Sequence, residues 1–213
     1  MKLYFLRHGQ GEHQITRVIP LDEITDTPLT ELGVKEVEVS TDIIVGLGIT
    51  AIYSSDYMRA QQTAGVVNEK LKLEIITDPR LCEVRMGELV GMPFGDIPAD
   101  YYADPRKYGG ENNHDMYARA SAAINDIVAA NAHDANVLIS GHGFCNSFLM
   151  YCACEGTDKP FDEAKFQATY HKPVVNAAIR MVDMSAKLPR TVQFVYGEDR
   201  RDEDILLKKT ESE

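Results

Sequence analysis

MKLYFLRHGQGEHQ, residues 1–14, joins a short apolar run to three residues of contrasting chemistry. The run from residue 2 to residue 6 consists of strand-forming residues and is too short for a helix. It ends at Arg7-His8-Gly9. Loops at the carboxyl ends of strands form the ligand crevice of an α/β sheet, and there a histidine can attack an electrophile while an arginine holds an anion. A lone Arg-His-Gly is more often an incidental surface loop, so a functional interpretation needs matching residues elsewhere.

Size and composition are those of an ordinary globular protein. The chain has 213 residues, 44% of them hydrophobic and 26% charged, which is enough for one sizeable core. The formal net charge of −11 argues against partners such as nucleic acid or an anionic membrane. No stretch approaches the roughly 20 apolar residues of a membrane helix, and the first residues do not resemble a signal peptide. We therefore expect a cytoplasmic protein.

The four cysteines indicate thiols rather than a metal centre. They lie in apolar or helical-looking surroundings. Cys152 and Cys154 form a C-x-C pair, but no second Cys/His pair has the spacing of a zinc site. We expect buried or partly buried free thiols at Cys82, Cys145, Cys152 and Cys154.

Short strand-like segments alternate with longer helix-like segments along the chain. Thr30 and Asp56 are each placed to cap the helix that follows. Such alternation predicts an α/β fold with a mostly parallel central sheet and helices on both faces. With no repeat, linker or break in composition, we expect a single domain over residues 1–213. Strands are expected at about residues 2–6, 50–54, 73–77, 136–140, 176–183 and 192–196, and helices at about residues 30–46, 57–71, 116–132 and 144–154.

Three regions lack this regularity. Residues 12–28 carry many turn-forming residues. Residues 86–115 are rich in Gly, Pro and Tyr, a composition as typical of a lid or binding loop as of a surface connection with short helices; we expect much of the leaving-group pocket here. From about residue 198 the tail is highly charged, and we expect it to be exposed and partly disordered.

A second buried strand ends, like the first, in His-Gly. In a parallel sheet His142 would lie at the same edge as His8, and close to it if the two strands are neighbours. Arg59 lies near the start of the helix after the second strand, where backbone N–H groups and the helix dipole also favour an anion. Glu83 follows the third strand and could supply a proton. Each residue alone has an ordinary structural explanation, but together they fit a phosphate, which needs several donors at close range.

Six motifs in a fixed order carry these residues. Their order and spacing resemble the histidine phosphatase superfamily, also called the phosphoglycerate mutase-like family, over most of the chain. The resemblance implies a three-layer α/β/α sandwich. The six motifs are Leu6-Arg7-His8-Gly9, residues 26–33 (D-x-P-L-T-x-x-G), residues 55–64 (S-D-x-x-R-A-x-Q-T-A), residues 81–91 (L-x-E-x-x-x-G-E-x-x-G), Gly110-Glu111 with Arg119, and Ser140-Gly141-His142-Gly143.

The resemblance also implies a role for each site residue. His8 would be the nucleophile that forms a phosphohistidine. Glu83 would protonate the leaving oxygen and then help to activate water. Arg7, Arg59 and His142 would also stabilise the charge of the transition state, and no metal or cofactor is required if the arginines supply the positive charge. The residues that bind the phosphate would be Arg7, Gln14, Arg59, His142 and Gly143.

Three departures from the family pattern leave the mechanism intact but the substrate open. Gly11 stands where the family often has Thr or Ser, which removes one possible hydroxyl donor to the phosphate. Gln14 stands where Asn is common, and its longer amide can still reach a substrate. Leu89-Val90 replaces the frequent Trp-Glu pair.

The leading interpretation is a metal-independent phosphomonoesterase that acts on a small phosphate ester through His8. The first alternative is a phosphoglycerate mutase, but residues 83–87 lack the His-Tyr pair typical of that branch. The second alternative is a non-catalytic module that binds a phosphate ligand, and retention of both His8 and Glu83 speaks against it. The sequence indicates neither the physiological substrate nor the oligomeric state.

Overall fold

The computed structural model describes residues 1–20 and 27–197. A six-stranded sheet in the order β3-β2-β4-β1-β5-β6 forms its centre. The pairs β3/β2, β2/β4 and β4/β1 are parallel, whereas β1/β5 and β5/β6 are antiparallel. The predicted mostly parallel sheet is therefore confirmed. The strands are β1 (Lys2–Arg7), β2 (Ala51–Ser54), β3 (Ile75–Thr77), β4 (Asn136–Gly141), β5 (Ile179–Asp183) and β6 (Val192–Tyr196).

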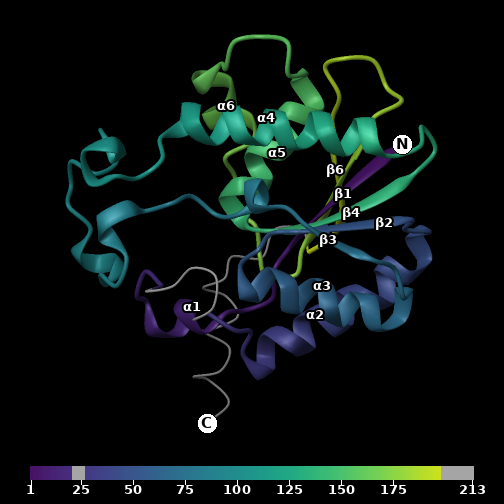
Figure 1. Ribbon diagram of the computed structural model, residues 1–213, viewed down its shortest axis with the longest axis horizontal. Helices are drawn as coiled ribbons and strands as arrows, with labels where there is room; N and C mark the ends of the chain where they lie inside the picture. Colours follow the sequence, from purple (N-terminus) through teal and green to yellow (C-terminus); the bar gives the residue numbers. More distant parts are fainter. Residues whose placement is uncertain (21–26, 198–213) are drawn as a thin grey trace.

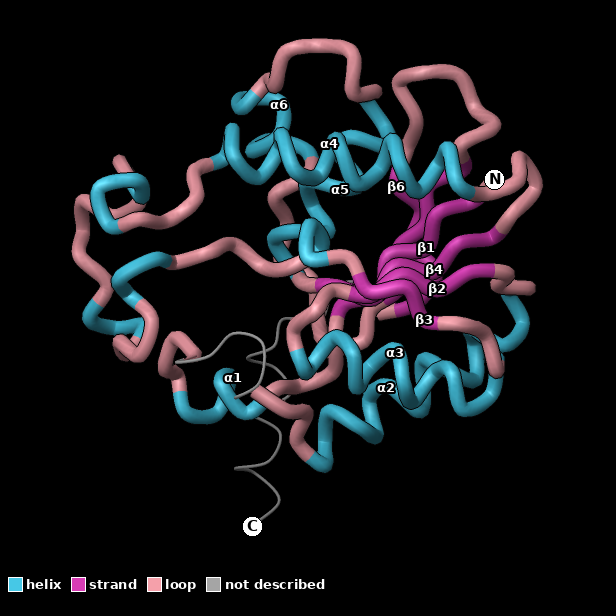
Figure 2. The backbone as a smooth tube through the Cα atoms, in the orientation of Figure 1, coloured by secondary structure: helices cyan, strands magenta, loops and turns pink. Residues whose placement is uncertain are grey.

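Helices cover both faces of the sheet, which gives the predicted α/β/α layers (Figure 1). Helices α2 and α3 lie together on one face, and α4, α5 and α6 lie on the other (Figure 2). The short helix α1 lies beyond the ends of the strands (Figure 2). The helices are α1 (Glu12–Thr16), α2 (Glu31–Ile44), α3 (Met58–Leu71), α4 (Asn113–Ala130), α5 (Gly143–Glu155) and α6 (Glu163–Thr169).

Strand β1 supplies side chains to the cores on both sides of the sheet. Successive side chains of a strand point to opposite faces. Leu3 and Phe5 therefore join the cluster beneath α4 and α5, while Tyr4 and Leu6 join the cluster beneath α2 and α3. Burial of one such side chain contributes about 1.5–3 kcal/mol. The apolar run of the sequence is thus the central element of the fold.

The pairing of β1 with β4 brings the two His-Gly motifs together. In their parallel register Leu6 lies opposite Ser140, and Arg7 lies opposite Gly141. The next residue of each chain segment is a histidine, so both histidines leave the sheet at the same edge.

Several element boundaries differ from the sequence prediction by one to three residues, and at two of them local contacts override propensity. Asp56 does not cap α3: the N-cap is Tyr57, and its backbone N–H donates to Ser55 Oγ at 3.2 Å. Strand β3 begins at Ile75 and not at residue 73, because Asn68 binds both the N–H and the C=O of Leu73 (2.8 and 2.7 Å) at the end of α3.

Strand β5 also begins later than predicted. It starts at Ile179 and not at residue 176. Ala177 has a φ of 54°, a left-handed conformation that no extended strand accommodates. By contrast, Thr30 caps α2 as predicted, because its side chain accepts the N–H of Gly33 at 3.0 Å.

Two short helices were not predicted at all. Helix α1 lies in the region that looks irregular in the sequence, and the side chain of Gln14 closes its N-terminus by accepting the Gly11 N–H at 3.0 Å. Helix α6 is anchored by Phe166, whose ring stacks on Phe148 with centroids 4.0 Å apart. Isolated helices of five and seven residues are unstable in water, so tertiary contacts form both of them.

Residues 86–115 contain three short 3-10 helices, Gly87–Leu89, Phe94–Asp96 and Pro105–Tyr108. The segment packs on residues 17–20 through a small hydrophobic cluster centred on Ile19, Leu89 and Tyr101. Its action as a lid remains a prediction. The predicted charged tail from residue 198 lies outside the described residues.

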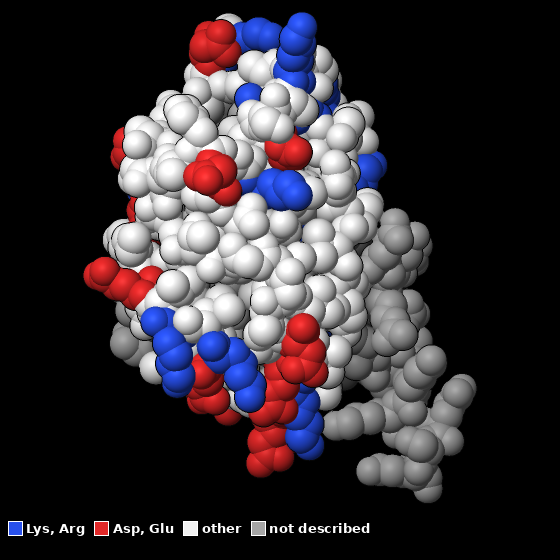
Figure 3. Space-filling model, turned by 90° about the vertical axis from the view of Figure 1, so that its right-hand side faces the viewer, with Lys and Arg blue, Asp and Glu red and all other residues white. Residues whose placement is uncertain are grey.

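The surface carries charges of both signs. On the face at which the parallel strands begin, Lys and Arg side chains lie among Asp and Glu side chains, and both gather at its lower rim (Figure 3). In the described part of the chain, no helix has the length and apolarity needed to span a bilayer.

Candidate active site

His8 lies immediately after β1 and is 3% exposed. Its backbone N–H donates to Gly141 O at 2.9 Å, which holds it against β4. Its Nδ1 lies 2.6 Å from Gly9 O. A carbonyl can only accept, so Nδ1 carries the proton and Nε2 keeps its lone pair.

Gly9 provides the close packing that this turn needs. A β-carbon at position 9 would lie 2.3 Å from the backbone oxygen of Gly33 in α2. Only glycine therefore lets the loop after β1 approach α2 this closely.

Arg59 lies in the first turn of α3 and is 4% exposed. Its Nε donates to His8 Nε2 at 3.3 Å, and its Nη1 donates to Thr27 Oγ1 at 2.8 Å. The guanidinium lies over the ring of Tyr57, 5.0 Å from the centroid. These contacts fix a positive charge beside the unprotonated nitrogen of His8.

His142 is fully buried and is the N-cap of α5. Its ring lies 5.2 Å from the ring of His8, between centroids. Its Nε2 lies 2.9 Å from Ser55 Oγ, a hydroxyl that accepts the N–H of Tyr57 and can donate its own proton to this nitrogen. The proton of His142 then lies on Nδ1, a buried atom with no hydrogen-bond partner among the described residues.

Arg7 and Gly143 meet at the start of α5. Arg7 donates through Nη1 to Val174 O. A β-carbon on Gly143 would lie 3.6 Å from Arg7 Nε, so the guanidinium passes directly over the first residue of this helix. The sheet edge thus brings together two arginines and two histidines.

Glu83 is held at the same helix start by backbone contacts. Its Oε2 accepts the N–H of Phe144 at 3.1 Å, and its Oε1 accepts the N–H of Cys145 at 2.9 Å. The carboxylate therefore lies within two residues of Gly143, on the side of the site formed by β4 and α5.

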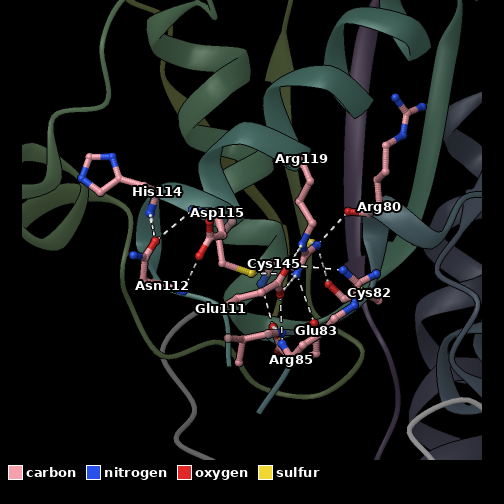
Figure 4. Close-up of polar contacts among 12 residues, drawn as sticks. Arg80, Cys82, Glu83, Arg85, Glu111, Asn112, His114, Asp115, Arg119 and Cys145 are labelled. Atoms are coloured by element: carbon pink, nitrogen blue, oxygen red, sulfur yellow. Dashed lines mark hydrogen bonds and ion pairs between the residues drawn. The ribbon is translucent and has the colours of Figure 1, made fainter. Parts of the chain in front are cut away.

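Arg119 of α4 fixes the loop that carries Glu83 (Figure 4). Its guanidinium donates to the backbone oxygens of Arg80, Cys82 and Glu83 at 2.8, 2.9 and 3.1 Å. Glu111 accepts two further hydrogen bonds from it, at 2.9 and 3.0 Å. The motif that pairs Glu111 with Arg119 therefore supports the site without facing it.

Gln14 has a different position from the other predicted phosphate ligands. Its Oε1 accepts the N–H of Gly11, and its Nε2 donates to Asn176 Oδ1 at 3.2 Å. Both ends of the amide are thus engaged in closing α1 and tying it to the loop before β5. Its role as a phosphate ligand remains a prediction.

The histidines of the site are neutral at pH 7. Burial, followed by the charges of Arg59 and of the neighbouring histidine, lowers the pKa of His8 well below its usual range. Burial and then Arg59 act in the same direction on the pKa of His142. Burial, then Arg59 and Arg7, lowers the pKa of a third histidine, His13, to about 3. A neutral His8 is a competent nucleophile, whereas an imidazolium is not.

Sequence reasoning missed three residues of the site. Thr27 and Ser55 position Arg59 and His142, as described above. Both lie inside motifs that the sequence shows, but the sequence interpretation assigned neither of them a role in the site. His13 lies 5.7 Å from His8 between ring centroids. The sequence signal for His13 is its position shortly after the first His-Gly motif.

A cavity of about 300 Å³ opens beside the site. His13 and Thr27 lie on its wall, so it adjoins Arg59 and His8. Ile19, which also lines it, is packed by Leu89 and Tyr101 from residues 86–115. This wall therefore comes from residues 12–20 and from Thr27, and the segment predicted to form the pocket packs behind it. The lining residues are Glu12, His13, Thr16, Val18, Ile19, Pro20 and Thr27.

Neither the cysteines nor the acidic residues form a metal centre in the described ranges. All four cysteines are buried and unpaired, as predicted. Within residues 1–20 and 27–197, no group of three or more His, Cys, Asp or Glu side chains is arranged to hold an ion.

Comparisons with known proteins agree with this geometry. The sequence model of the histidine phosphatase superfamily (branch 1) matches residues 3–192. A probable phosphoglycerate mutase, GpmB, from Proteus mirabilis is 31% identical over 160 residues, which cover 70% of this chain and 73% of that protein. Its counterpart from Yersinia pestis is 29% identical over 160 residues, with the same coverage.

Solved structures share the fold. A mycobacterial glucosyl-3-phosphoglycerate phosphatase complexed with VO3 superposes with a TM-score of 0.74 at 23% identity, covering 93% of this chain and 99% of that one. A putative α-ribazole-5'-P phosphatase from Escherichia coli has a TM-score of 0.72 at 19% identity, covering 94% and 98% of the two chains.

Proposed function

Because this chain belongs to the histidine phosphatase superfamily, whose members are phosphatases or mutases, we propose that it is a metal-independent phosphomonoesterase acting on a small phosphate ester. The observation that carries the proposal is the pair of neutral, buried histidines with rings 5.2 Å apart, flanked by Arg59 and Arg7. One histidine presents a lone pair and the other a proton, both beside fixed positive charge.

His8 is the proposed nucleophile. Its Nε2 attacks phosphorus, and the bond between phosphorus and the ester oxygen breaks to give a phosphohistidine and an alcohol. The 2.6 Å contact of Nδ1 with Gly9 O supports this role, because it fixes the tautomer and disperses the positive charge that the ring acquires. Water then attacks the phosphohistidine and releases inorganic phosphate, which restores the lone pair of Nε2.

The cations of the site carry most of the proposed catalysis. Phosphoryl transfer needs positioning and charge stabilisation more than covalent chemistry. Arg59, Arg7 and the Nδ1 proton of His142 can surround three phosphoryl oxygens, and Gly143 keeps the space above Arg7 open. These fixed donors are the physical argument for a reaction without metal or cofactor.

Glu83 is the proposed proton donor for the leaving oxygen and the later acceptor for a proton of water. Its hydrogen bonds to the start of α5 hold the carboxyl group at the edge of the phosphate site. The bonds from Arg119 to the loop backbone support this placement.

The substrate is proposed to be a small molecule. A volume of about 300 Å³ is at the small end of ligand pockets, and the net charge of −11 disfavours nucleic acid and membranes as partners. The protein is proposed to act in the cytoplasm.

Phosphoglycerate mutase activity is the second candidate, because relatives at 31% and 29% identity carry that name. A mutase must return the phosphoryl group from the phosphohistidine to its substrate and exclude water. Residues 83–87 lack the His-Tyr pair of that branch, and Arg85 instead is half-exposed beside Glu111. Hydrolysis is therefore the better-supported reaction.

The test is release of phosphate from an aryl phosphate in the presence of EDTA, alongside a phosphoglycerate mutase assay. We expect EDTA-resistant hydrolysis by the wild type and none by His8→Ala. Mutase activity with negligible hydrolysis would establish the second candidate. Binding of inorganic phosphate without turnover of any ester would identify a non-catalytic binding module instead.

A further inference from the structure

We propose that His13 is a further phosphate-binding residue and that position 11 is a glycine because the His13 imidazole fills the space of its side chain. The inference rests on the proposed function only in assuming that the site binds a phosphoryl group. His13 belongs to none of the six motifs. Its ring nevertheless lies 5.7 Å from that of His8 between centroids, which places it among the groups that would surround the phosphoryl oxygens.

Gly11 is not required by the backbone. Its φ of −99° and ψ of 155° lie in the extended region, which every residue adopts. Space is what requires it: a β-carbon at this position would lie 2.7 Å from His13 Nδ1 and 2.9 Å from His13 Cε1. The same β-carbon would lie 3.4 Å from Arg59 Cδ. The imidazole therefore occupies the place, beside Arg59, from which a side chain at position 11 would reach the site.

The nitrogen in that place has an unused hydrogen-bonding capacity. His13 Nδ1 is buried and has no partner among the described residues. A buried polar group without a partner costs free energy, and an oxygen of a bound phosphate would satisfy it. The depressed pKa keeps the ring neutral, so in the Nδ1–H tautomer it donates a hydrogen bond and adds no charge next to Arg59 and Arg7.

His13 also marks the boundary between the phosphate site and the cavity, since its ring lines both. A donor there holds the phosphoryl group while the rest of the ester extends into the 300 Å³ space. The glycine at position 11 and the histidine two residues later thus form one unit, in which the imidazole replaces a hydroxyl donor.

The experiment is calorimetric titration with inorganic phosphate, which requires the phosphate site but no turnover. His13→Ala should weaken phosphate binding about 10-fold or more, the value of one hydrogen bond to a charged group. Adding Gly11→Ser to His13→Ala should restore binding to within about 3-fold of the wild type, because the serine hydroxyl then reaches the vacated place. The matched control is Gly11→Ala with His13→Ala, which adds the β-carbon without the hydroxyl and should not restore binding.

Each outcome is decisive once circular dichroism shows that the variants fold. Equal phosphate affinity of the wild type and His13→Ala would overturn the inference and leave the proposed function standing. Equal recovery by Gly11→Ser and Gly11→Ala would also overturn it, because His13 would then act only by packing. A wild type that does not bind phosphate would overturn the proposed function itself.

Discussion

The junctions that follow β1 and β4 start from the same dipeptide and present opposite nitrogens to the site. After β1 the chain turns at Gly9, whose carbonyl accepts a hydrogen bond from His8 Nδ1 and leaves Nε2 beside Arg59. After β4 the chain enters α5 directly. Here Ser55 Oγ is hydrogen-bonded to Nε2 of His142, so that Nδ1 is left for a ligand. The partner of each ring, a backbone carbonyl for His8 and a serine hydroxyl for His142, therefore decides whether the ring offers a lone pair or a proton.

His8→Ala, which removes the proposed nucleophile after β1, should have the largest effect. Removal of the lone pair beside Arg59 should lower kcat on the order of 10⁴-fold or more and abolish the phosphoenzyme. Rapid quenching with a radiolabelled ester, followed by counting of acid-labile phosphate on the protein, measures both effects. Label that persists in His8→Ala would move the nucleophile to another residue.

Glu83→Gln tests the carboxylate that is tied to the β4 junction. Loss of the proton donor should lower kcat by about 10²–10⁴-fold on alkyl phosphates, whose leaving oxygens are basic. Formation of the phosphohistidine from aryl phosphates, which leave without a proton, should keep nearly the wild-type rate in a rapid-quench measurement, while its later hydrolysis by water slows. Glu38→Gln, the same substitution at an exposed position of α2, provides the matched control. An equal loss in the rate of phosphohistidine formation from both classes of ester would contradict a role in protonation.

His142→Ala should have a smaller effect than His8→Ala. It removes one donor to the phosphoryl oxygens, a change that typically costs about 10²–10³-fold in kcat. The nucleophile remains, so the phosphoenzyme should still accumulate, more slowly, in the same rapid-quench measurement. Complete loss of the phosphoenzyme would show that the two histidines do not divide the work as proposed.

Ser55→Ala sharpens the comparison at the level of a single hydrogen bond. It leaves Nε2 of His142 buried without its partner, which should lower the free energy of unfolding by about 1–3 kcal/mol in urea titrations. The nitrogen chemical shifts of the His142 ring should move as the tautomer changes. Ser54→Ala, one residue earlier, removes a hydroxyl that donates to the Ser55 carbonyl and should leave those shifts in place.

The last prediction concerns the pH dependence of stability. The pKa values of three histidines, His8, His142 and His13, are lowered in the folded state. Below pH 6.5 the unfolded chain therefore binds more protons than the folded protein does. Their contribution is complete above pH 6.5 and is lost as the pH falls, by about 1 kcal/mol per pH unit for each group. Urea titrations at pH 7.5 and 5.5 measure it, and His13→Asn should make the slope shallower. An unchanged slope would mean that His13 titrates normally.

Much of the fold was predictable because its central strands are buried on both faces. The apolar runs of β1 and β4 are long enough to be recognised, and both end in chemistry-bearing residues. The ends of elements were less predictable because they depend on distant or local contacts, as with Asn68 at Leu73 and the left-handed Ala177 before β5.

The site was predictable where sequence spacing fixes position. His8, His142 and Arg59 each follow a strand of one parallel sheet, so their convergence follows from topology. His13 could not be placed in this way, because α1 is too short to be predicted. The His13 ring also reaches the site through the space that a side chain at position 11 would occupy. The orientation of Gln14 was equally inaccessible, because it depends on Asn176 in a loop 162 residues away in the chain.

Helix α5, which begins at Gly143, carries three of the four thiols. Burial raises the pKa of Cys145 and Cys152 to about 12 and that of Cys154 to about 11, so each is a protonated and inaccessible sulfhydryl. Alkylating reagents can therefore react only when the helix separates from the sheet. The rate of covalent labelling at these three positions therefore measures local opening of the helix that supports the phosphate site. If added phosphate slows the labelling, the decrease in rate measures how strongly the ligand stabilises the packing of that helix on the strands.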